Sequence, residues 1–124
     1  MMPNEITVNV SLGVKNGFLS QSLNPGTILV TMTGTTATGG AQEIGTSTNA
    51  EAISMNDVSS AGYAYFRNTD TTNYLDIGSG TGTNFAAVVR LKAGEAGVFR
   101  LGTNAPTARA NTAAVKLQYF ILSD

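Results

Sequence analysis

Histidine and cysteine are both absent from this chain of 124 residues. Histidine is the side chain whose ordinary pKa lies closest to neutrality, and the cysteine thiolate is the strongest side-chain nucleophile near that pH. Their absence excludes imidazole bases, thiolate nucleophiles and the metal sites that depend on these ligands. The sequence therefore predicts a protein that is not an enzyme, with no catalytic residue, no cofactor and no metal.

Charge and long hydrophobic runs are also scarce. Charged residues make up 12% of the chain and the formal net charge is −1, so we expect no nucleic-acid partner and no anionic membrane surface. The longest apolar run, residues 85–89, is far shorter than the roughly 20 residues that span a bilayer. The first residues lack the cationic and apolar regions of a signal peptide. A chain with so little charge repels other copies weakly, which suits assembly.

Short runs that alternate apolar and polar residues fill most of the chain. The clearest alternation extends from Ile6 to Val14, and it predicts a strand over residues 5–14. Turns are predicted at Lys15-Asn16-Gly17 and at Asn24-Pro25-Gly26, and a loop over residues 34–40. Further strands are predicted over residues 18–23, 27–33, 42–47, 51–55, 62–68, 74–78, 85–91, 97–101 and 115–122.

Two pairs of these strands are predicted to form β-hairpins, the first over residues 62–78 and the second over residues 85–101. The continuous apolar run in residues 85–91 predicts a strand buried on both faces. About eight or nine strands at spacings of roughly 8–14 residues are typical of a β-sandwich or a small barrel. We therefore predict an all-β protein with a single domain.

No short motif in the chain carries strong chemistry. The glycine-rich run at residues 78–82 lacks the third glycine and the following helix of a dinucleotide-binding fingerprint. Asp70, Asn73 and Asp76 offer oxygen ligands, but their spacing does not match a calcium loop. We instead expect Asp70 to accept backbone hydrogen bonds in a turn.

Aromatic and arginine side chains leave two alternatives open. Tyr63, Tyr65, Phe66 and Tyr74 either form a platform for a sugar or a single strand, or pack within a hairpin, and we favour packing. Alternation places Tyr63 and Tyr65 on one face and Phe66 on the other. The arginines of the predicted strands either face solvent or form ion pairs between subunits; they are Arg67, Arg90 and Arg100.

Four segments of the second half resemble small structural proteins from the heads and necks of tailed bacteriophages, with capsid cement or decoration proteins the first to be considered. They are AGYAYFRNTD at residues 61–70, NYLDIG at 73–78, VRLKAGEAGVFRL at 89–101, and residues 113–122. The resemblance implies a jelly-roll-like β-sandwich of about eight strands over residues 1–124, with residues 1–5 as a flexible arm. It further implies a homotrimer that binds the outside of the capsid.

That resemblance sets the functional expectations. We expect a virion protein, assembled in the cytoplasm of a bacterial host, that binds the major capsid protein at capsomer junctions and stabilises the shell. Met2 and Pro3 in the arm, and Phe18 and Leu19 after a turn, are the expected contact residues. The alternatives are a neck, tail or fibre component, and a carbohydrate-binding adhesion module.

Overall fold

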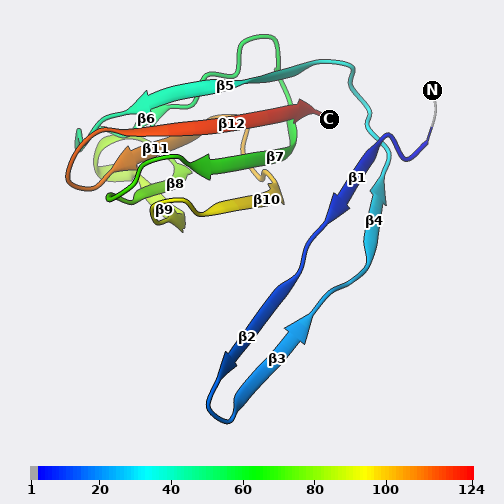
Figure 1. Ribbon diagram of the computed structural model, residues 1–124. Helices are drawn as coiled ribbons and strands as arrows, with labels where there is room; N and C mark the ends of the chain where they lie inside the picture. Colours follow the sequence, from blue (N-terminus) through cyan, green and yellow to red (C-terminus); the bar gives the residue numbers. More distant parts are fainter. Residues whose placement is uncertain (1–2) are drawn as a thin grey trace. The chain divides into compact units, whose positions relative to one another are not determined.

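A computed structural model describes residues 3–124 of the chain (Figure 1). The chain divides into two compact units, Met1–Thr33 and Gly34–Asp124. Nearly all regular structure is β-strand, and the single helical element within the described residues is the short 3-10 turn Gly82–Asn84. None of the helical structure described there is long and apolar enough to cross a membrane. The predicted all-β class is confirmed.

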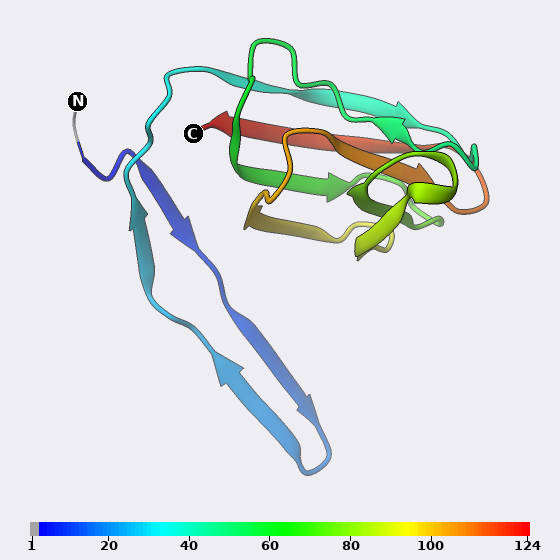
Figure 2. The same cartoon turned by 180° about the vertical axis from the view of Figure 1, so that it is seen from behind.

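The first unit is a two-stranded antiparallel ribbon, whose two sides run next to each other in both views (Figures 1 and 2). One side of the ribbon is β1 (Ile6–Asn9) followed by β2 (Leu12–Asn16), and the other is β3 (Leu19–Leu23) followed by β4 (Thr27–Val30). Within it β1 pairs with β4, and β2 pairs with β3. The alternating residues 6–14 therefore do form strands, although two residues interrupt them.

The ribbon reverses direction at Gly17 and Phe18. Asn16 pairs with Leu19, so the turn is centred one residue later than the sequence predicted. Gly17 has a φ of 59°, and a two-residue hairpin turn of type II′ places glycine at its first central position for this reason. Asn16 cannot act as a central turn residue here because it already belongs to the ladder.

The second predicted turn, at residues 24–26, does not reverse the chain. Three residues separate β3 from β4, whereas two separate β1 from β2 on the opposite side. Gly26 adopts a φ of 83° and donates its backbone N–H to Asn24 Oδ1 at 2.8 Å. The segment is therefore a local irregularity of the bulge kind, with one extra residue on one side of the ribbon.

The second unit is a sandwich of eight strands in two antiparallel four-stranded sheets. One sheet has the order β10-β7-β12-β5, and the other has the order β6-β11-β8-β9. The strands are β5 (Ala37–Ile44), β6 (Glu51–Ala52), β7 (Ala61–Asn68), β8 (Leu75–Ser79), β9 (Ala86–Leu91), β10 (Ala96–Arg100), β11 (Pro106–Ala110) and β12 (Val115–Ser123). The first of the eight pairs with the last and the second with the seventh, which is the jelly-roll arrangement.

The core lies between the two sheets and is built from alternate residues of their strands. Four residues of β12 are buried on one face, as predicted: Val115, Leu117, Tyr119 and Ile121. Phe66 of β7 is fully buried and its ring lies 5.6 Å from that of Phe99. Every member of the main hydrophobic cluster lies between residues 44 and 121. The sandwich therefore has a core of its own within the second unit.

Both hairpins predicted in the second half are wrong. Strand β7 pairs with β10 and β12, while β8 pairs with β9 and β11 in the other sheet. Likewise β9 and β10 follow each other in sequence but belong to opposite sheets. Alternation fixes which side of a strand is apolar, and it does not select the strand that pairs with it.

Two further strand predictions are corrected by the sheet order. Strand β9 is an edge strand rather than a strand buried on both faces, and its Val88 is 83% exposed. The predicted loop over residues 34–40 ends early, because β5 begins at Ala37. Its threonine and glycine residues are tolerated there, since β5 is the other edge of its sheet and most of its side chains face solvent.

Candidate interaction surfaces

The ribbon carries an apolar face that is exposed in the single chain. Strand pairing sets Leu12 opposite Leu23, and Asn16 opposite Leu19. Paired residues of an antiparallel ladder lie on the same face, so Leu12, Leu19 and Leu23 share one face, together with Val14. These four side chains are 42–66% exposed. Apolar alternation that would line a core in most proteins here lines an open surface.

The two contact residues predicted inside the chain lie at the tip of this ribbon. Phe18 is fully exposed at the turn, and Leu19 is 58% exposed at the start of β3. Pro3 is also exposed and precedes β1, at the opposite end of the ribbon from Phe18. Met2 lies outside the described residues. The structure thus brings Phe18 and Leu19 together, while the role of all four residues as contacts stays a prediction.

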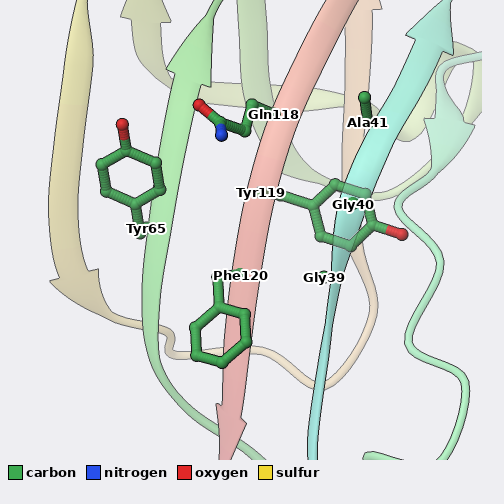
Figure 3. A pocket seen from close by; sticks show the side chains of 7 residues that line it. All are labelled: Gly39, Gly40, Ala41, Tyr65, Gln118, Tyr119 and Phe120. Atoms are coloured by element: carbon green, nitrogen blue, oxygen red, sulfur yellow. The ribbon is translucent and has the colours of Figure 1, made fainter.

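A second surface is the outer face of the sheet β10-β7-β12-β5 (Figure 3). Phe120 lies opposite Tyr65 on one neighbouring strand and opposite Gly39 on the other. A Cβ atom at Gly39 would come within 2.6 Å of the Phe120 ring, so the aromatic ring requires glycine beneath it. The side chains of Tyr65 and Phe120 border a shallow depression of about 400 Å³ together with Gln118.

The predicted aromatic cluster is divided between core and surface. Tyr63 and Tyr65 are half-buried on the outer face of β7, and Phe66 is buried on the inner face, as alternation predicted. Tyr74 lies apart from them on the other sheet, where the guanidinium of Arg90 covers its ring at 4.0 Å. The cluster therefore does not form one platform.

A polar pocket of about 270 Å³ surrounds Tyr74 on the outer face of the second sheet. Arg90 donates to both carboxylate oxygens of Asp76, from Nε at 2.8 Å and from Nη2 at 3.2 Å. This hydrogen bonding to Asp76 raises the pKa of Arg90. Arg109 is the register partner of Asp76 on the opposite side, and its guanidinium lies 4.8 Å from the Phe85 ring. The pocket thus presents two guanidinium groups around one carboxylate.

Asp70 and Arg100 are occupied by contacts within the chain, while Arg67 is exposed on β7. Asp70 accepts hydrogen bonds from the backbone N–H groups of Thr72 and Asn73 at 3.0 and 2.6 Å, which confirms the expected turn and lowers the pKa of Asp70. Arg100 forms an ion pair with Asp124. Among the described residues, no group of three or more acidic, histidine or cysteine side chains is placed to hold a metal ion.

An apolar groove that no sequence pattern predicted lies at one open side of the sandwich, between the edge strands β9 and β10. The groove has a volume of about 580 Å³. Three partly buried core residues reach its floor: Val89, Phe99 and Leu101. We missed it because residues 85–101 were predicted to pair as a hairpin, and a hairpin leaves no opening between its strands. We call this opening the edge groove.

Comparison with protein-family models, with curated proteins and with solved structures finds no match to this chain.

Proposed function

We propose that this protein is a decoration protein of a tailed-bacteriophage capsid. It binds the outside of the major capsid shell at capsomer junctions, as a homotrimer, and stabilises that shell. The observation that carries the proposal is the exposed apolar ribbon. An isolated two-stranded ribbon is marginally stable in water, so a chain that devotes its first unit to one is built to work in an assembly.

The fold of the second unit supports the same role. Eight-stranded jelly rolls occur in viral capsid domains as well as in lectins. The sandwich adds an exposed aromatic sheet face around Tyr65 and Phe120. A fold hosts many functions, so the argument rests on these adhesive surfaces rather than on the topology alone.

Linkage explains how such a protein would stabilise a shell. A molecule that binds the assembled shell and not its dispersed subunits shifts the equilibrium toward the shell. A trimer that attaches at several points multiplies modest contacts into strong attachment. This role requires a stiff scaffold and exposed contact surfaces, and it assigns the protein to the virion surface after assembly in the bacterial cytoplasm.

The decisive experiment compares particles with and without the protein. We expect particles lacking it to release DNA at a lower temperature, and purified protein to restore the original temperature when added back. Equal heat resistance of both particles would overturn the proposal. Copy number separates the related alternative, because hundreds of copies per particle indicate a capsid position and a dozen or fewer indicate a neck, tail or fibre.

The polar pocket favours one second candidate, a carbohydrate-binding adhesion module. Arginine, carboxylate and tyrosine groups around a single pocket can donate to and accept from sugar hydroxyls. A glycan array probed with the purified protein and with the Tyr74→Ala variant tests this candidate. Binding by the wild-type protein that the variant loses would establish it, and an array without binding would reject it.

A further inference from the structure

We infer that the ribbon tip of one copy, formed by Phe18 and Leu19, docks in the edge groove of a second copy of the same chain. The inference rests on the proposed function for its oligomeric setting and names the partner of the ribbon. It follows from three features: a ribbon with an exposed apolar face, a groove of matching chemistry, and a ribbon whose reach exceeds the distance from the link to the near end of the groove of its own chain.

The ribbon exposes enough apolar surface for a stable interface. Between the irregular segment and the tip, its large exposed side chains are Val10, Leu12, Val14, Phe18, Leu19 and Leu23. At roughly 100 Å² each, they present on the order of 600 Å², the lower end of the roughly 600–1,000 Å² that one partner contributes to a standard interface. Phe18 projects farthest and is the kind of aromatic anchor that dominates binding energy.

The edge groove matches the tip in size, polarity and charge. A volume of about 580 Å³ falls within the roughly 300–1,000 Å³ of small-molecule pockets, so it has room for two apolar side chains. Phe99 in its floor offers a ring to Phe18, and aromatic pairs add binding energy beyond their buried area. Lys15 is the one ionisable side chain in residues 6–30. Arg100 at the rim already forms an ion pair with Asp124. Docking of the tip therefore buries no unpaired charge.

Chain connectivity favours a second copy over the same chain. The backbone N–H of Met32 donates a hydrogen bond to Glu5 Oε1 at 3.2 Å, so the ribbon extends to Met32. Only Thr33 then separates the ribbon from Gly34, where the second unit begins. From Met32 to Phe18 a ribbon of this length reaches about 40 Å. The groove begins at Leu101, which follows β10 and donates its backbone N–H to Gly62 of β7. Strand β10 lies two strands from β12, so this end of the groove lies on the order of 20 Å from that link. Whatever direction the ribbon takes from this link, its tip therefore lies farther from the link than the near end of the groove does.

Docking of this kind creates a heterologous contact, because the ribbon tip and the groove are different surfaces. Contacts of this type close into a ring when the rotation between copies permits. A closed ring of three copies, each with its tip in the next groove, is the arrangement that agrees with the proposed trimer. The open edges of β9 and β10 would then be covered in the assembly, as edge strands generally need to be.

Site-directed cross-linking tests the contact in the purified protein, and the chain has no native cysteine to interfere. One copy carries Ser20→Cys beside the tip, and a second, differently tagged copy carries Ser79→Cys in the groove lining. We expect a short bismaleimide to link the two copies. Ser11→Cys, about 20 Å from the tip, is the matched control and should not link. A cross-link within monomers of the double variant Ser20→Cys/Ser79→Cys would overturn the inference.

Sedimentation gives an independent measurement. The double variant Phe18→Ser/Leu19→Ser should raise the dissociation constant of the oligomer at least about tenfold, while Leu29→Ser should not. Leu29 is the matched control because it is 55% exposed, like Leu19 at 58%, but lies near the other end of the ribbon. An oligomer unchanged by Phe18→Ser/Leu19→Ser, or a wild-type monomer whose tip variant loses shell binding, would overturn the inference.

The failure of this inference and the failure of the proposed function are distinguishable. If copies do not cross-link but the protein still protects particles from heat, the docking inference is wrong and the decoration role stands. If copies cross-link and particles without the protein resist heat equally well, the decoration role is wrong and the self-docking stands.

Discussion

The side chain of Asn68 donates a hydrogen bond to the backbone carbonyl of Leu91 at 2.9 Å, and this bond joins the two sheets of the sandwich. The same amide group donates to the carbonyl of Asn73 at 2.9 Å, and Asn68 Oδ1 accepts from the N–H of Asp70 at 2.8 Å. Asn68 is completely buried. One amide therefore fixes the turn after β7 and its approach to the end of β9.

Removing this amide should destabilise the sandwich strongly. Asn68→Ala leaves buried carbonyl groups without donors, and we expect a loss of about 2–4 kcal/mol in the free energy of unfolding. Asn68→Asp keeps the shape of the side chain but replaces the amide N–H donors by a carboxylate oxygen. It should therefore lower the free energy of unfolding at neutral pH by at least as much as Asn68→Ala. Urea unfolding measures both. The exposed control Asn84→Ala should stay within about 0.5 kcal/mol, and an unaffected Asn68→Asp would contradict the assigned role.

Gly78 should tolerate no side chain. It lies in β8 beside an irregularity in the pairing with β9, and a Cβ atom there would overlap the backbone carbonyl of Ala86. Because backbone atoms cannot rotate aside as a side chain can, Gly78→Ala should lower the free energy of unfolding by about 1–3 kcal/mol or more. Gly102→Ala is the control, because nothing lies within 4 Å of a Cβ atom at that position. Thermal unfolding of the two variants should differ clearly, and equal midpoints would refute the close approach.

The turn at Asp70 should make stability depend on pH in the acid range. Backbone hydrogen bonds from Asn73 and Thr72 lower the pKa of Asp70 below its ordinary value of 3.8. A carboxyl group with a lower pKa in the folded state adds stability above pH ~4, and this contribution is lost as the pH falls through the folded-state pKa. The difference in melting temperature between wild type and Asp70→Asn should therefore shrink between pH 6 and pH 3. A difference that grows on acidification would contradict this account.

The sandwich should fold without the ribbon. All residues of the main core cluster lie beyond residue 43, and the ribbon contributes none of them. A chain that begins at Gly34 should keep its β-type circular dichroism and unfold cooperatively, since the core and both sheets remain. If the shortened chain is unfolded, the first unit supplies stability that the core alone does not explain. By the docking inference, the same chain should no longer assemble.

The sequence predicted local structure better than pairing. Alternation in residues 115–122 identified both the strand and its buried face, and alternation in residues 62–68 separated Tyr65 from Phe66 correctly. The two hairpins failed because a short polar connection can join neighbours in one sheet or cross between two sheets. The sequence also pointed to Phe18 and Leu19, because a turn followed by apolar residues is visible in it, and both side chains are exposed; their role as contacts stays a prediction. The edge groove depends on strand pairing and left no such signal.

What the sequence determines by itself is the strand content and the polarity of each strand face, because side chains alternate with a period of two residues whatever the partner is. What only the tertiary structure decides is the cover for each apolar face. For β12 the cover is the opposite sheet, and for the ribbon strand β2, with an equally regular pattern, the chain itself supplies none. The physical reason is that burial depends on contacts between residues distant in sequence. A local pattern shows which face of a strand is apolar, and it does not determine which surface packs against that face.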